Sequence, residues 1–230
     1  MEELPTWIAP LFILCCGYTL FAFHLGNGRS WLLTAMLIGW TLIHGVLAKA
    51  GFYQDTMSMP PRFALIFVPN VLFIIYGCLP KNREWLRASR NSRWSSAVHI
   101  VRIPVEIILW QLALHKWVPE LMTFEGRNFD ILVGISAILV TYLIAQNKIS
   151  RKALIAWNYI GLFFVLFILG NGILSTELPF QQFAFDQPNK AITFFPYALL
   201  PGLIVPVVIW SHISDIILLN AEKKTPPPER

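Results

Sequence analysis

The segment from Ala153 to Leu174, ALIAWNYIGLFFVLFILGNGIL, decides the fold class, because it carries no charged residue along its whole length. A helix of about 20 mainly apolar residues crosses the hydrocarbon core of a bilayer. The composition agrees with this, since 56% of the 230 residues are hydrophobic and 13% are charged. Ordinary soluble domains contain about 45 to 50% apolar and about 25% charged residues. The sequence therefore predicts a multi-pass membrane protein and excludes a soluble globule, a coiled coil and a disordered chain.

Further apolar runs of spanning length lie on both sides of this segment. The predicted spans are Trp7–His24, Trp31–Ala48, Phe63–Leu79, Ala97–Lys116, Ile131–Ala145, Ala153–Leu174 and Thr193–Leu219. We therefore predict an all-α integral membrane bundle of seven transmembrane helices, which occupies residues 1–220. The Pro-rich, charged residues 221–230 are predicted to form a disordered cytoplasmic tail.

The orientation follows from the distribution of Lys and Arg, because basic loops stay on the cytoplasmic side. The loop 81–94 is the most basic one, and it places the N-terminus outside and the C-terminus inside. The net charge of +5 is thus mainly a topology signal, and no nucleic-acid partner is predicted. Trp85 and Trp94 alternate with the arginines of this loop, which favours contact with anionic lipid headgroups. The predicted location is the inner (plasma) membrane of the cell.

The cysteines and the N-terminus give no sign of secretion or of a metal site. Cys15, Cys16 and Cys78 lie in or beside apolar runs, without a C-x-x-C or Cys/His spacing. No disulfide framework or structural zinc site is predicted. The acidic start of the chain lacks the basic region of a cleaved signal peptide, so we expect the first apolar segment to remain in the mature protein.

Ionisable residues form a stripe on the fourth predicted span. His99, Arg102 and Glu106 fall on one helix face at 100° per residue, and Pro104 weakens the backbone ladder between them. An ionisable residue inside a bilayer costs about 2.5 to 3.5 kcal/mol, so each needs a partner, water or a function. Arg102 and Glu106 are four residues apart and are expected to pair within the helix.

Other ionisable groups are predicted at a similar depth, toward the cytoplasmic half. They are His24 at the end of the first span, and His212 and Asp215 on the seventh. The predicted ligand or proton site therefore comprises Glu106, Arg102, His99, His212, Asp215 and His24. Glu106 is the protonatable group, Arg102 its charge partner or an anion contact, and the histidines are relays. The structural alternative is that these groups only tie helices together near the headgroups.

A second, outer candidate site is formed by His44 on the second span and His115 at the end of the fourth. The following loop, which is expected outside, adds Glu120, Glu125, Arg127 and Asp130. Asn128 or Asp130 is expected to cap the fifth span.

Two other classes of function stay open at this level. Histidine-bound haem b or another metal would make the protein a redox protein or membrane-embedded enzyme, with His24 facing His99 or His212 and His44 facing His115. No Glu-x-x-His motif of a di-metal carboxylate site occurs, and the seventh span has no lysine for retinal. The third class is a non-catalytic sensor or a subunit of a homo-oligomer or membrane complex.

Three stretches carry a resemblance to a known group of proteins. They are His99-x-x-Arg102-x-Pro104-x-Glu106, residues 122–130 (MTFEGRNFD) and residues 183–189 (FAFDQPN). The chain resembles a family of uncharacterised bacterial multi-pass (seven-helix) membrane proteins over most of its length. The resemblance implies a bacterial inner-membrane location, and it implies no activity, ligand or cofactor.

Overall fold

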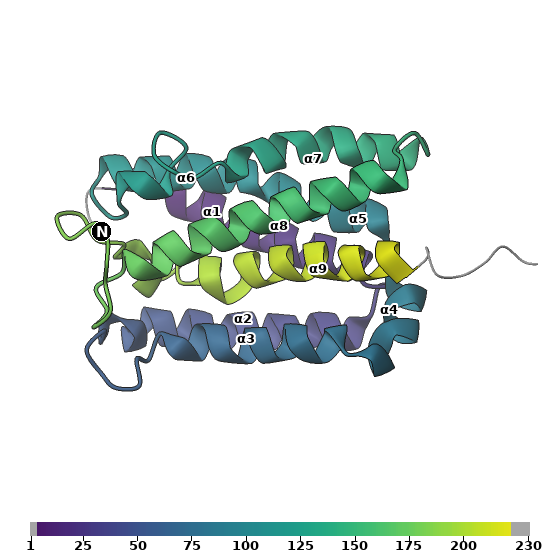
Figure 1. Ribbon diagram of the computed structural model, residues 1–230. Helices are drawn as coiled ribbons and strands as arrows, with labels where there is room; N and C mark the ends of the chain where they lie inside the picture. The colour runs from purple at the N-terminus through teal and green to yellow at the C-terminus, as the bar shows by residue number, and fades with distance from the viewer. Residues whose placement is uncertain (1–3, 222–230) are drawn as a thin grey trace, which may run out of the picture.

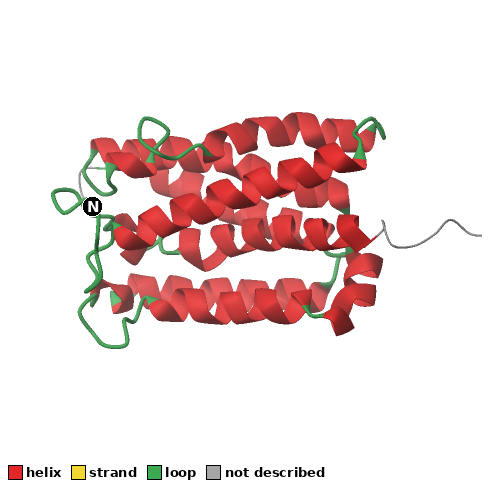
Figure 2. Cartoon of the chain, in the orientation of Figure 1, coloured by secondary structure: helices red, strands yellow, loops and turns green. Residues whose placement is uncertain are grey.

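The computed structural model describes residues 4–221 of the chain. Over these residues it is built from helices and loops, without a β-strand, so the all-α prediction is confirmed (Figures 1 and 2). Most helices run side by side along one axis, and α4 (Arg83–Ser89) covers one end of the bundle (Figure 1). We call this end the α4 end and the opposite one, where the longer loops lie, the long-loop end. The predicted tail falls on residues 221–230, of which all but Ala221 lie outside the described part.

Each predicted span contains a helix. The helices along the bundle are α1 (Ile8–Gly26), α2 (Trp31–Lys49), α3 (Ala64–Cys78), α5 (Ser92–Ala97), α6 (Arg102–Leu114), α7 (Asp130–Ala145), α8 (Arg151–Leu174) and α9 (Val205–Ala221). Short 3₁₀ turns are η1 (Phe52–Gln54), η2 (Pro80–Asn82), η3 (Val98–Val101), η4 (Glu120–Met122) and η5 (Ala191–Thr193), and η6 (Leu200–Ile204) is a π-helical turn.

Five helical segments are long and apolar enough to cross a membrane: α1, α2, residues 92–114, α8 and residues 200–221. A sixth is obtained if α3 and residues 80–89, which bend by 68° at their junction, count as one span. Helix α7 is apolar but has only 16 residues. These lengths agree with an integral membrane protein, whereas the count of seven spans and their orientation stay predictions.

The surface of the bundle is apolar and part of its interior is polar. Leu32, Val46 and Phe163 expose 73%, 68% and 62% of their surfaces, whereas Arg102 and Glu106 expose 3% and 2%. Contiguous apolar surface of this kind is rare on soluble monomers. This distribution is the one expected when lipid, instead of water, surrounds the helices.

Helix α9 lies at the centre of the bundle, in contact with α3, α5 and α8. Gly77 on α3 makes one of these contacts possible, because a Cβ atom there would stand 2.5 Å from the Trp210 ring. The main apolar core surrounds Ile108 and Leu203, neither of which has any exposed surface. Polar groups on α9 are thus held in the interior by packing on several sides.

The chain enters α9 through the irregular turn η6. Pro206 has no backbone N–H, so the carbonyl of Gly202 lacks its usual helical partner. That carbonyl accepts a hydrogen bond from Asn70 Nδ2 on α3, at 3.4 Å. π-helical turns inside helices often occur at functional sites.

Helix α7 begins in the middle of the bundle, not at its long-loop end (Figure 1). Its first residue, Asp130, reaches Arg102, halfway along the segment 92–114, at 3.3 Å. Glu106 lies eight residues before the end of α6, which is about 12 Å at 1.5 Å per residue. Residues 115–129 therefore fold back into the bundle, which explains why the fifth predicted span is short.

The basic loop 81–94 is not an open loop. It forms η2 and α4, in which Leu86 is buried, and then continues into α5. Trp85 is 41% exposed, whereas Trp94 packs edge-on against Phe21 at 5.5 Å.

A buried polar column as candidate functional site

One helix face carries polar residues through the depth of the bundle. Ser95, His99, Arg102 and Glu106 follow one another at intervals of four, three and four along α5, η3 and α6. This spacing returns to the same face at each helical turn. All four residues are buried. We call them, with the side chains that they contact, the polar column.

Arg102 is the centre of the column. Its guanidinium pairs with Asp130 at 3.3 Å and donates to the Gly161 carbonyl at 3.4 and 3.5 Å. A further bond of 3.0 Å joins Arg102 Nη2 to His212 Nε2. The partners come from α7, α8 and α9, so the arginine joins three helices to its own. A buried arginine requires such partners, because it keeps its charge.

The contacts of His212 define its tautomer. A guanidinium can only donate, so Nε2 of His212 must accept the bond from Arg102. The proton therefore sits on Nδ1, which donates to Asn158 Oδ1 at 2.9 Å. The Asn158 amide is oriented in turn by donating to the Leu154 carbonyl. His212 is thus a neutral imidazole held in one orientation.

His99 has no such partners. Its ring stacks on that of His212, with centroids 3.9 Å apart and planes at 16°, and Trp157 lies edge-on at 5.3 Å. The residue is fully buried, and both ring nitrogens lack a hydrogen-bond partner among the described residues. Such a group costs about 1 to 3 kcal/mol when it is left unpaired. It is therefore a candidate for a functional role.

Glu106 is held by Asn128 and not by Arg102, so the predicted pair within the helix is not formed. Asn128 Nδ2 donates to Glu106 Oε1 at 2.6 Å and to the Met122 carbonyl at 3.0 Å. The other carboxyl oxygen, Oε2, is buried without a partner among the described residues. The charge partner of Arg102 is Asp130, and one carboxyl oxygen of Glu106 stays free to take a proton or a ligand atom.

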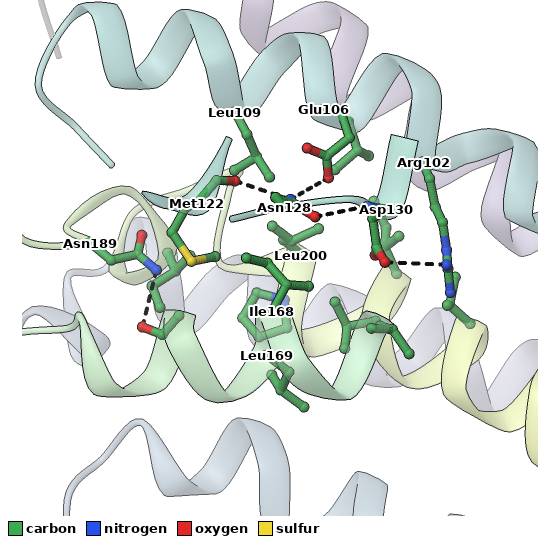
Figure 3. Close-up of a pocket in the computed structure, with 18 of the residues that line it drawn as sticks. Arg102, Glu106, Leu109, Met122, Asn128, Asp130, Ile168, Leu169, Asn189 and Leu200 are labelled. Carbon is green, nitrogen blue, oxygen red and sulfur yellow. Dashed lines mark hydrogen bonds and ion pairs between the residues drawn. The ribbon is translucent and has the colours of Figure 1, made fainter. Parts of the chain in front are cut away.

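A cavity of about 70 Å³ adjoins these groups. Arg102, Glu106, Asn128, Asp130 and Asn189 line it together with apolar side chains from α6, α8, η6 and α9. Figure 3 shows Arg102 and Asn189 on opposite sides of the cavity, with Glu106 and Asn128 between them. A water molecule needs about 10 to 15 Å³ of such space and several polar partners. The cavity can therefore hold a few water molecules or a solute of a few atoms.

The part of the polar column near the α4 end holds Asp215. Asp215 pairs with Arg90 at 2.8 Å and accepts a bond from Ser95 at 2.6 Å. Arg90 also donates to Ser95, to Asn27 Oδ1 at 3.0 Å and to the Ser211 carbonyl at 3.2 Å. The sequence analysis grouped Asp215 with Arg102, but in the structure Asp215 forms its ion pair with Arg90. Although Arg90 lies in the basic loop 81–94, its side chain is only 1% exposed.

The remaining predicted histidines lie apart from the column. His24 donates to Thr34 at 2.8 Å and packs against Trp31. His115 donates to the carbonyl of Gln111 on its own helix at 2.8 Å. Both histidines make local contacts in this structure, outside the polar column.

His44 is the buried member of the predicted outer pair. Its Nδ1 bonds the Tyr53 hydroxyl, and Trp40 packs edge-on against its ring. Burial raises the pKa of Tyr53 to about 12, so the phenol keeps its proton. The other ring nitrogen, Nε2, is buried without a partner among the described residues. Through Tyr53, His44 joins α2 to η1.

The histidines do not fit a bis-histidine haem. The described pair in ring contact, His99 and His212, lies face to face at 3.9 Å, whereas axial ligands must point their nitrogens at iron from opposite faces of a macrocycle. His24, His44 and His115 make the separate contacts given above. Within residues 4–221, no group of three or more His, Cys, Asp or Glu residues is arranged to hold a metal ion.

Comparison with known protein families identifies a family for this chain. Residues 60–220 match the family model described as "Domain of unknown function (DUF8737)". The chain belongs to this family. The match begins just before α3 and ends in α9, so it includes the whole polar column. No curated protein and no solved structure matches the chain.

Sequence reasoning missed several residues of the column. Asp130 and Asn128 were placed in an outer loop or at a cap, and Asn158 was not among the predicted site residues. The signal that could have located the first two is the length of the fifth span. This span is shorter than the about 20 residues that cross a bilayer, which indicates that its helix begins inside the bundle. No local pattern pointed to Arg90 as a buried residue, because it lies among exposed arginines such as Arg87.

Proposed function

We propose that this protein is an integral membrane protein of seven spans, with its N-terminus outside, that binds or translocates a proton or a small solute at the polar column. The observation that carries the proposal is the position of Glu106. Its free oxygen Oε2 is buried beside a cavity that can hold water. An ionisable group at this depth, in a protein surrounded by lipid, is a functional-site hypothesis by default.

The balance of charge favours a proton over an anion. The centre of the column holds one guanidinium, Arg102, and two carboxyl groups, those of Asp130 and Glu106. The charge of Arg102 is already balanced by that of Asp130. The two hydrogen bonds of His212 require an uncharged imidazole. If Glu106 is ionised, the buried site has one uncompensated negative charge, which is costly in a medium of low dielectric. A proton on Glu106 removes that charge.

The course of the column supports translocation. From Glu106 it continues through Arg102 and the stacked histidines toward Ser95, Asp215 and Arg90 at the α4 end. The folded-back segment 115–129 brings irregular backbone to the same depth, which membrane proteins tolerate where it is buried or lines a cavity. Broken segments beside a polar site are also typical of transporters.

Proton uptake into proteoliposomes tests the proposal. The protein is reconstituted into liposomes that contain a pH-sensitive dye, and a potassium diffusion potential drives protons inward. We expect faster acidification than in protein-free liposomes, and we expect Glu106→Gln to reduce it to the protein-free rate. The matched control is Glu125→Gln, which changes an exposed glutamate of the same chain and should acidify like the wild type. Equal rates for wild type and Glu106→Gln would contradict translocation through this site.

A further inference from the structure

A second cavity lies at the long-loop end and shares one lining residue with the first. It has a volume of about 270 Å³ and is lined by Gln54, Thr56, Thr176, Glu177, Asn189, Lys190, Thr193 and Phe194. We call it the vestibule. Most of these side chains are polar, and the charged pair on its rim, Lys190 and Glu177, lies 3.6 Å apart with both side chains about half exposed. The vestibule therefore combines contact with solvent and a neutral rim.

Asn189 belongs to the lining of both cavities. The residue is only 1% exposed, and its backbone N–H bonds the Ser175 carbonyl at 2.8 Å, which holds it between them. Its side-chain Nδ2 donates to the Gly172 carbonyl at 3.3 Å, whereas Oδ1 is buried without a partner among the described residues. An unpaired amide oxygen at a junction of two cavities is a position at which a water molecule can bind.

Apolar groups surround the rest of this junction. The Met122 side chain packs against Gly172, where an added Cβ would stand 3.0 Å from the methionine methyl group. In Figure 3, Met122 and Asn189 lie on the same side of the cavity, and Glu106 lies farther toward Arg102. The amide of Asn189 is thus the polar group between the vestibule and the apolar wall of the inner cavity.

We propose that protons reach Glu106 from the vestibule on water molecules that pass Asn189, so that this asparagine is the entrance residue of the site. A hydronium ion in the inner cavity gives one proton to Glu106 Oε2: an O–H bond forms on the carboxylate, the hydronium O–H bond breaks, and a water molecule remains. Asn189 acts as a positioning residue, because it holds the water and does not take the proton. This inference rests on the proposed function.

The test uses the proton uptake assay with three further variants. Asn189→Leu keeps the branched shape of the side chain, makes it somewhat larger and removes its polar atoms, and we expect it to lower the rate at least tenfold. Asn189→Ser keeps a hydroxyl and gives more room for water, and we expect it to retain at least half of the wild-type rate. Asn171→Leu is the matched control. Asn171 is a buried asparagine whose side-chain Nδ2 donates to the Phe167 carbonyl of its own helix, and it lines neither cavity, so its replacement should leave the rate near that of the wild type.

The outcomes separate this inference from the proposed function. If Glu106→Gln stops uptake but Asn189→Leu conducts like the wild type, the entrance is not at Asn189, and the proposed function stands. If the wild type conducts no faster than Glu106→Gln, both fail. A low rate in Asn189→Leu together with a high rate in Asn189→Ser supports the inference, because a merely structural role would not distinguish the two so strongly. Equal losses in both variants would overturn it.

Discussion

At the scale of the residue, the buried ion pair at the centre of the column makes a clear prediction. Asp130→Asn removes the carboxylate that pairs with Arg102 and leaves a buried guanidinium without its closest counter-charge. Breaking a buried pair in this way costs roughly 3 to 5 kcal/mol. We expect a clearly lower unfolding midpoint in detergent. Asp186→Asn, which changes an exposed aspartate, is the control and should melt like the wild type. Equal midpoints for the two variants would contradict the pairing.

Two glycines of α8 give a second prediction at this scale. A Cβ atom at Gly161 would stand 2.4 Å from His212 Cε1, whereas one at Gly170 would have no atom within 4 Å. Gly161→Ala should therefore displace His212 and destabilise the protein by about 1 to 3 kcal/mol. Gly170→Ala should be neutral or slightly stabilising, because alanine favours the helix. Thermal unfolding of both variants checks this difference. A Gly161→Ala protein as stable as the wild type would contradict the close contact between Gly161 and His212.

At the scale of the element, α4 is fixed to the bundle through Arg90. This arginine bonds Asn27, which follows α1, and groups of α5 and α9. The bridge between Asn27 and Arg90 joins the loops at the same point. Arg90→Ala would leave Asp215 buried without its cation, at a cost of roughly 3 to 5 kcal/mol. Arg87→Ala, on the exposed face of α4, should cost less than about 0.5 kcal/mol. Protease cleavage near residues 83–91 should increase only in the Arg90 variant. Equal cleavage in both variants would show that Arg90 does not fix α4.

The helices themselves could be predicted from the sequence, because apolar runs of spanning length are a strong local signal. The stripe of His99, Arg102 and Glu106 was also visible, since it depends only on helical periodicity. The partners of those residues were not. Asp130 reaches Arg102 because a loop folds back into the bundle, and loops carry no periodic pattern that would show it. Asp215 and Arg90 meet across 125 residues of sequence, so only the tertiary fold identifies them as a pair.

At the scale of the whole molecule, the distribution of positive charge predicts the orientation in the membrane. The predicted topology places the basic segment 81–94 and the C-terminus inside. Because the predicted number of spans is seven, the N-terminus then lies outside. A reporter enzyme that is active only outside the cytoplasm should be active when fused before Met1 and inactive when fused after Arg230. Insertion of the reporter between Gln146 and Asn147, in the turn between α7 and α8, should also leave it inactive. Activity at both termini would indicate an even number of spans.

Orientation matters for the account of the site, because it decides which side supplies protons to the vestibule. The long-loop end contains the vestibule, and the predicted topology places this end outside. Inward proton movement would then pass Glu106 before it reaches the network of Arg90 and Asp215 at the α4 end.

The most direct test of the central claim is an infrared pH titration of the purified protein, which detects the carbonyl stretch of a protonated carboxylic acid. We predict a band in the wild type that changes with pH, is absent in Glu106→Gln and is retained in the control variant Glu125→Gln. A band that is identical in wild type and Glu106→Gln would show that Glu106 does not exchange a proton, and it would contradict the account.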